Sequence, residues 1–193
     1  MSSKGFAGRA ASAAFRAAIC LALEAGIAPH GLRATETAPA LGTARLALAG
    51  HRFAVARAIQ GATAQLADAR CQALLDEFKD AEGRPLRSVL TTLGLTMSDY
   101  AKQVFFYDAP EWACRGGGGN LAVTRPGNRA IFVCGARFQR EMAKNSRNAE
   151  AIVIHELLHS LGLGENPPSS DHITARVRAQ CGRAEAARVG SAK

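Results

Sequence analysis

The sequence predicts an α+β fold: an N-terminal helical region, a small β-sheet with a hairpin, a buried helix and a C-terminal helix. Apolar residues recur at helical spacing over 44–80, and short β-prone runs separated by turn residues occupy 104–134. A helix with apolar residues on nearly all sides then spans about 148–161. A chain of 193 residues with 48% hydrophobic content suits one domain. We expect a single domain over 41–193, preceded by an N-terminal extension over 1–40.

The extension over 1–40 shows no clear hydrophobic period. Its apolar run over 17–28 is preceded by Lys4, Arg9 and Arg16 and is interrupted by Glu24. A secretory signal needs a longer uninterrupted apolar core, and no stretch is long enough to span a membrane. The extension therefore contains no convincing signal peptide. It is still a possible processed segment.

The region 44–80 is predicted to be helical, with an interruption near Gly50 or Gly61 and a core face formed by Leu66, Leu74, Leu75 and Phe78. Pro85 is suited to the start of a short helix that ends at Leu93. A second short helix is expected over 99–103, followed by a strand over 104–107.

The segments 120–124 and 129–134 are predicted to pair as a β-hairpin. Pro126 and Gly127 between them fit the two central positions of a type II turn. The four glycines at 116–119 precede the hairpin as a flexible loop. They do not indicate a phosphate-binding loop, because no Gly-Lys-Ser/Thr sequence follows.

The run from His155 to His159 is the pattern in the chain that most directly indicates chemistry. Asn148 is a candidate cap for this helix. Histidines four residues apart lie on one face of a helix, so both imidazoles can reach one Zn²⁺. Glu156 can then act as general base toward a water molecule that the metal activates.

A catalytic zinc site requires a third protein ligand. Gly162 can adopt positive φ and end the helix, and Glu165 is the first side chain after it that can bind a metal. Pro167 and Pro168 then stop further helix. We favour Glu165. His172 is the alternative third ligand and Asp171 a weaker one.

A last helix follows, capped by Ser169 or Ser170, with Ile173, Val177 and Cys181 on one face.

The five cysteines contain no Cys-x-x-Cys pair, so a second, structural zinc site is not expected. Cys114 and Cys134 flank the glycine loop and the hairpin, which favours a disulfide between them. Cys71 and Cys181 lie in the first and last helices of the domain and form the second predicted disulfide, leaving Cys20 in the extension. Two disulfides would place the protein in an oxidising compartment, secreted or periplasmic. The alternative is five buried free thiols in a cytosolic protein.

The spacing of His155, Glu156, His159, Gly162 and Glu165 resembles the zincin metallopeptidases. It is similar to the metzincin signature with glutamate in place of the third histidine, but no methionine follows Met142 to form a methionine turn. A glutamate third ligand is similar to the gluzincins, whose glutamate lies on a separate helix. Residues 148–182 also resemble small uncharacterised bacterial proteins with this motif.

The resemblance implies a zincin-like domain with one Zn²⁺ per chain that hydrolyses peptide bonds in a peptide or protein substrate, with Glu156 as the base. One strand of the 120–134 hairpin is then the candidate edge strand for the substrate. Tyr100, Tyr107 and His172 are candidates for stabilising the oxyanion. The alternative function is a catalytically inactive zincin-like binding module with a structural metal or none.

The net charge of +8 comes from scattered arginines, with no block of basic residues and no interleaved aromatic platform. Specific nucleic-acid binding is therefore not expected. We expect a monomer without a transmembrane segment.

Overall fold

The computed structural model describes residues 43–115 and 119–182. The predicted α+β class is confirmed, whereas the expectations about residues 1–40, Cys20 included, lie outside the described residues. The helices are α1 (Ala49–Gln65), α2 (Ala69–Gln72), α3 (Leu74–Glu77), α4 (Leu86–Leu93), α5 (Met97–Ala101), α6 (Glu111–Arg115), α7 (Gly135–Lys144), α8 (Ser146–Ser160) and α9 (Ser170–Cys181). None of these helices is long and apolar enough to cross a membrane.

The described part of the chain forms a three-stranded sheet in the order β1-β3-β2. Strand β1 (Phe105–Asp108) runs parallel to β3 (Ala130–Val133), and β2 (Ala122–Val123) runs antiparallel to β3. The predicted hairpin is therefore confirmed. Its turn closes with a 3.0 Å hydrogen bond from the Asn128 N–H to the Arg125 carbonyl. Gly127 has φ of +76°, which the third position of a type II turn requires.

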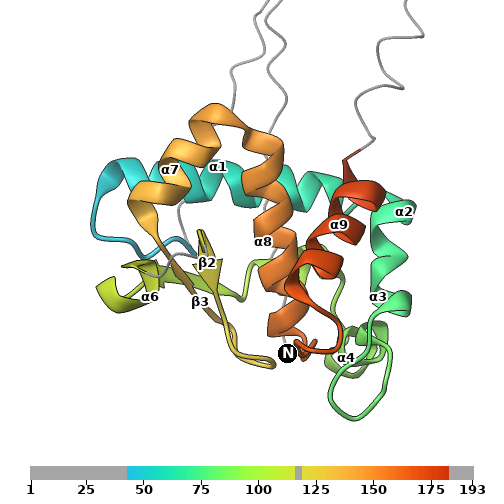
Figure 1. Cartoon of the computed structure of the whole chain (residues 1–193). Helices are drawn as coiled ribbons and strands as arrows, with labels where there is room; N and C mark the ends of the chain where they lie inside the picture. The colour runs from blue at the N-terminus through green and yellow to red at the C-terminus, as the bar shows by residue number, and fades with distance from the viewer. Residues whose placement is uncertain (1–42, 116–118, 183–193) are drawn as a thin grey trace, which may run out of the picture. The chain divides into compact units, whose positions relative to one another are not determined.

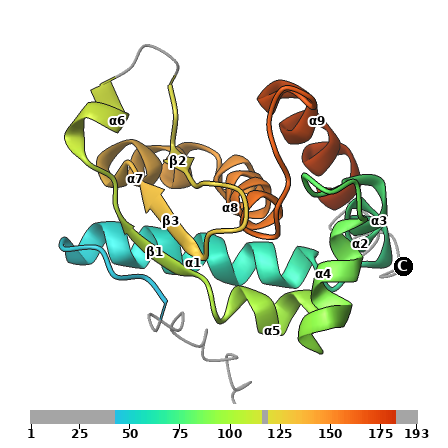
Figure 2. The same ribbon diagram turned by 90° about the horizontal axis from the view of Figure 1, so that it is seen from below.

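Helix α8 lies at the centre of the fold (Figure 1). It packs against α1, α7 and α9 and also contacts β2 and β3. Viewed from below, the sheet and α9 lie on opposite sides of α8 (Figure 2). Helix α1 runs across the lower part of this view. Every residue from Val153 to Ser160 is buried. The prediction of a buried motif helix is confirmed, because neighbours cover it on all sides.

Two local predictions about the helices were wrong. Asn145, not Asn148, caps α8, since its side chain accepts the Asn148 N–H at 3.1 Å. The first helix is not interrupted at Gly50 or Gly61 but ends at Gln65. A Cβ at Gly61 would lie 2.4 Å from the Glu150 carboxyl carbon, so this glycine lets α1 approach α8 closely.

Helix α7 has no counterpart among the predicted elements. Phe138 is buried, and Met142, one turn later on the same face, is partly buried against the core. The remaining face is polar, so this helix is amphipathic.

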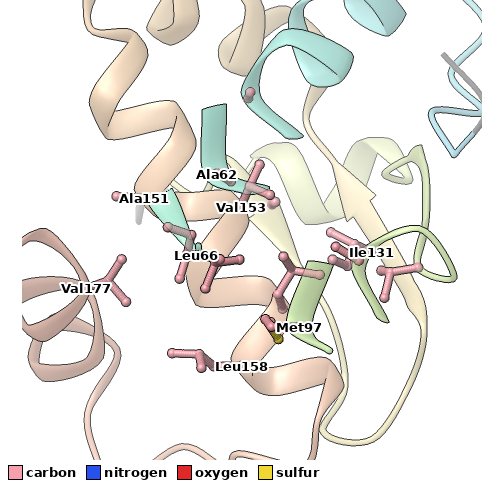
Figure 3. Close-up of a cluster of buried hydrophobic side chains, with 14 of the residues drawn as sticks. Ala62, Leu66, Met97, Ile131, Ala151, Val153, Leu158 and Val177 are labelled. Carbon is pink, nitrogen blue, oxygen red and sulfur yellow. The ribbon is translucent and has the colours of Figure 1, made fainter. Parts of the chain in front are cut away.

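The core lies where α1, α8, α9 and the sheet meet (Figure 3). Leu158 from α8, Val177 from α9, Ile131 from β3 and Leu66 after α1 are buried there. The predicted core residues Leu66, Leu74, Leu75 and Phe78 are buried, as are Ile173, Val177 and Cys181 on the predicted face of α9. Ser169 caps α9, which confirms the first of the two predicted caps.

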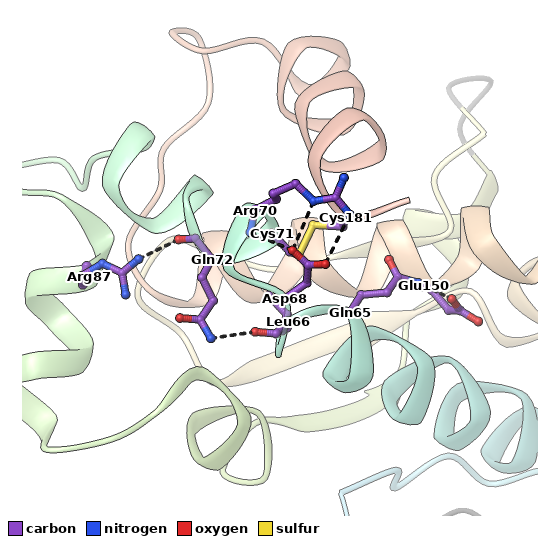
Figure 4. Close-up of a disulfide and its surroundings, with 9 residues drawn as sticks. All are labelled: Gln65, Leu66, Asp68, Arg70, Cys71, Gln72, Arg87, Glu150 and Cys181. Carbon is purple, nitrogen blue, oxygen red and sulfur yellow. Dashed lines mark hydrogen bonds and ion pairs between the residues drawn. A yellow bond between two sulfur atoms is a disulfide. The ribbon is translucent and has the colours of Figure 1, made fainter. Parts of the chain in front are cut away.

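Both predicted disulfides are present. Cys71 at α2 joins Cys181 at the end of α9, 110 residues later (Figure 4). Cys114 in α6 joins Cys134 at the end of β3, across 20 residues. The first bond ties the end of α9 to α2, and the second holds α6 beside the sheet.

Leu158→Ala should lower the free energy of unfolding by about 2–5 kcal/mol, because the side chain is fully buried and its loss leaves a cavity. Leu93→Ala is the matched control, since Leu93 is 40% exposed and its truncation should cost less than about 1 kcal/mol. Urea denaturation monitored by circular dichroism measures both. Equal losses would contradict the described core.

Replacing both cysteines of the Cys71–Cys181 pair by serine should destabilise the protein more than replacing both of the Cys114–Cys134 pair. The longer loop restricts the unfolded chain more, by about 1.5 kcal/mol in the chain-entropy model. Thermal unfolding under non-reducing conditions compares the two double variants. The reverse order would show that native packing, and not loop length, determines the contribution of each bond.

Candidate metal centre

His155 and His159 lie one turn apart on the same face of α8. Both side chains are 4–5% exposed, and their Nε2 atoms are 2.9 Å apart. This proximity follows directly from the four-residue spacing on a helix. Two imidazole nitrogens therefore converge on one point.

The turn after α8 brings a carboxylate to the same point. Gly162 has φ of +115°, and the chain reverses there as its position in the sequence predicts. The Glu165 Oε1 lies 3.3 Å from the Nε2 of His159 and 3.8 Å from the Nε2 of His155. The ligand atoms of these three residues all lie within 4.8 Å of one another, so the group could hold a metal ion.

The opposite ring nitrogens are held by the protein. The Nδ1 of His159 lies 2.7 Å from the Leu163 carbonyl, and the Nδ1 of His155 lies 3.0 Å from the Thr174 hydroxyl. A carbonyl only accepts, so Nδ1 of His159 donates and leaves the Nε2 lone pair free to bind a metal. Such partners commonly orient metal-binding histidines.

Burial keeps His155 neutral near pH 7. Its pKa is lowered to about 4, chiefly by desolvation and secondly by the neighbouring His159. Glu165 opposes both effects, since its negative charge favours protonated imidazole. A neutral imidazole is the form that binds a metal cation.

Glu156 is a buried carboxylate with one oxygen free of hydrogen bonds. Its pKa is raised to about 8, chiefly by burial and secondly by the negative charge of Glu165. A hydrogen bond from the Thr124 backbone lowers the pKa in part. Its Oε2 has no hydrogen-bond partner. An unpaired buried carboxylate oxygen is costly, which indicates that Glu156 is placed to receive a ligand, a water or a proton.

These groups line a cleft of about 260 Å³ between α8 and β2, which we call the metal cleft. Its walls include His155, Glu156, His159 and Glu165 on one side and Asn120, Ala122, Val123, Thr124 and Pro126 on the other. The Gly127 N–H donates to the His159 carbonyl at 2.9 Å. This hydrogen bond joins the hairpin turn to the last turn of α8, and it sets the width of the cleft at that end.

The other predicted site residues lie elsewhere. His172 is not in the converging group, and its ring packs edge-on against Phe78. Asp171 is exposed and lines an adjoining hollow that also includes His155 and Glu156. The Tyr100 hydroxyl donates to the Ser160 carbonyl inside the core, and Tyr107 is 38% exposed on the strand farthest from β2. Neither tyrosine lines the metal cleft.

Two residues of the site were missed by the sequence reasoning. Thr174 orients His155, and the Thr124 backbone contacts Glu156. Both are ordinary polar residues in a helix and a hairpin, and no local pattern distinguishes them. Their roles depend on contacts between segments distant in sequence.

Two imidazole nitrogens and one carboxylate oxygen form a donor set that suits a divalent transition metal. No family model, curated protein or solved structure matches this chain. The assignment of the site therefore depends on its geometry.

Glu165→Ala should weaken metal binding by orders of magnitude, because it removes one of three ligands, whereas His172→Ala should change it little. His159→Ala is the positive control for ligand loss. Competition with a chromogenic chelator, read for each purified variant, gives the affinities. If His172→Ala strips the metal while Glu165→Ala retains it, the third ligand is His172.

Proposed function

We propose that the protein is a zinc-dependent metallopeptidase. Helix α8, which carries the two histidines, and an edge strand would have a zincin-like arrangement. The observation that carries the proposal is the placement of Glu156. Its unpaired buried carboxylate lies beside three converging metal-ligand atoms in one cleft. This combination supplies a cation site, a base and room for a substrate.

Zinc is the metal that the donor set favours. Zn²⁺ accepts two histidines and one carboxylate and retains an open position in catalytic sites, whereas Ca²⁺ and Mg²⁺ prefer oxygen ligands. With three ligands from one chain, we expect one zinc per protein. When bound, zinc acts as a Lewis acid that polarises a carbonyl and lowers the pKa of water to about 7.

Glu156 acts as the general base in this proposal. Its free oxygen accepts a proton from the attacking water and returns it to the leaving amine. Without a cation, its raised pKa favours the protonated form near pH 7, and a cation at the three ligands would favour the carboxylate form that a base requires. Asn120 and Ser170 line the cleft and provide hydrogen-bonding groups for the substrate.

An extended peptide is the substrate whose shape the cleft fits. Strand β2 is one of the two edge strands of the sheet, and its residues form one wall of the metal cleft. A peptide added alongside β2 would pair with the strand through backbone hydrogen bonds and lie across the metal ligands. The sequence left both strands of the hairpin as candidates for pairing with the substrate. Strand β3 is central and already paired on both sides, which leaves β2.

The two disulfides support an exported protein, because such bonds persist in oxidising compartments. We therefore propose a secreted or periplasmic enzyme acting on peptides or unfolded proteins.

Glu156→Gln should retain zinc and the fold but lower peptide hydrolysis by about 10²–10⁴-fold, because the amide cannot accept the proton. Cleavage of a quenched fluorescent peptide library, with zinc measured in the same samples, tests this. Glu82→Gln at an exposed position is the matched control and should leave the rate unchanged.

A zinc-loaded wild type that cleaves no member of the library, before or after removal of residues 1–40, would contradict the enzyme and favour the binding module. Full activity in Glu156→Gln would exclude this residue as the base.

A further inference from the structure

The face of the sheet directed away from the core carries exposed aromatic side chains. Tyr107 of β1 and Phe132 of β3 are paired in register and are 38% and 37% exposed. Their ring centroids are 6.2 Å apart, and Phe105 lies 6.5 Å from Tyr107 on the same strand. The alternate residues Phe106 and Ile131 are buried on the core face.

Helix α6 forms a wall beside this aromatic face. Trp112, the single tryptophan of the chain, is 78% exposed on α6. The Cys114–Cys134 disulfide attaches this helix to the end of β3. A hollow of about 440 Å³ lies between α6 and the hairpin, lined by Pro110, Trp112, Ala113, Val123, Thr124, Arg125, Asn128 and Phe132. We call it the aromatic hollow.

The aromatic hollow and the metal cleft share the residues of the edge strand. Val123 and Thr124 line both. Successive side chains of a β-strand point to opposite faces of its sheet. A peptide paired with β2 would therefore direct one side chain toward the metal cleft and the next toward the aromatic hollow.

We propose that the aromatic hollow binds a large apolar side chain of the peptide that lies in the metal cleft. The proposal rests on the proposed function, and it names the preferred substrate: peptides with phenylalanine or a similarly large apolar residue at one position. Arg125 is the charged residue among those that line the hollow, and Trp112 and Phe132 supply aromatic surface. Aromatic rings and an apolar side chain bury each other's surface, which favours binding.

Binding is measured first, without cleavage. The probe is a blocked hexapeptide of alternating alanine and serine in which phenylalanine replaces each position in turn, added to zinc-loaded Glu156→Gln protein. Because Trp112 is the single tryptophan of the chain, tryptophan fluorescence reports directly on the aromatic hollow. A saturable blue shift is expected with phenylalanine at one position, or at two positions separated by one residue, and not with the unsubstituted peptide.

Hydrolysis is measured second, on otherwise wild-type protein. Trp112→Ala should lower kcat/KM for the preferred phenylalanine peptide about tenfold and leave that for the unsubstituted peptide unchanged. Phe53→Ala removes another exposed aromatic residue, on α1 and outside the hollow, and is the matched control. It should leave the phenylalanine preference intact.

The outcomes separate the two proposals. A saturable emission shift in a protein that hydrolyses nothing supports the hollow and contradicts the proposed hydrolysis. Hydrolysis without any phenylalanine preference, and with no effect of Trp112→Ala, overturns the hollow and leaves the enzyme in place. Sedimentation that shows a dimer dissociated by Trp112→Ala also overturns it, because the face would then bind a second copy of the chain.

Discussion

The burial of His155, Glu156 and His159 among the apolar residues of α8 is the constraint on which the rest of the structure depends. Polar groups removed from water cost free energy unless each finds a partner. Here the partners come from three segments: the Leu163 carbonyl after the turn, the Thr174 hydroxyl on α9 and the Thr124 backbone on the hairpin. The atoms left over, two Nε2 lone pairs and one oxygen of Glu156, are those that a metal site and a general base require.

The elements around α8 maintain this arrangement from several directions. The Gly127 N–H and the Tyr100 hydroxyl donate to the carbonyls of His159 and Ser160 at the end of the helix. The Cys71–Cys181 bond fixes the end of α9, the helix that carries Thr174. Gly61 lets α1 pack closely against α8. The two histidines of the candidate metal site are thus held in place by contacts from several elements.

The three-stranded sheet has two faces with different properties. One packs on α8 and contributes Ile131 and Phe106 to the core, whereas the other presents Tyr107 and Phe132. Strand β2 lies at an edge of the sheet, and its residue Val123 lines both the metal cleft and the aromatic hollow. A single added peptide strand could therefore contact both sites, through backbone pairing at the edge and through side chains on the two faces.

Features that depend on neighbours in sequence were determined by the sequence alone. The i, i+4 histidines, the reversal of the chain at Gly162 and the Pro126-Gly127 turn each involve a few adjacent residues, so local backbone geometry suffices to predict them. Tertiary structure decided the rest. Whether Glu165 or His172 joins the histidines, how Thr174 and Thr124 complete the site, why Gly61 does not break α1, and where Trp112 lies all depend on packing between distant segments. Such contacts leave no periodic pattern in the sequence, because each is made once, between residues that the fold alone brings together.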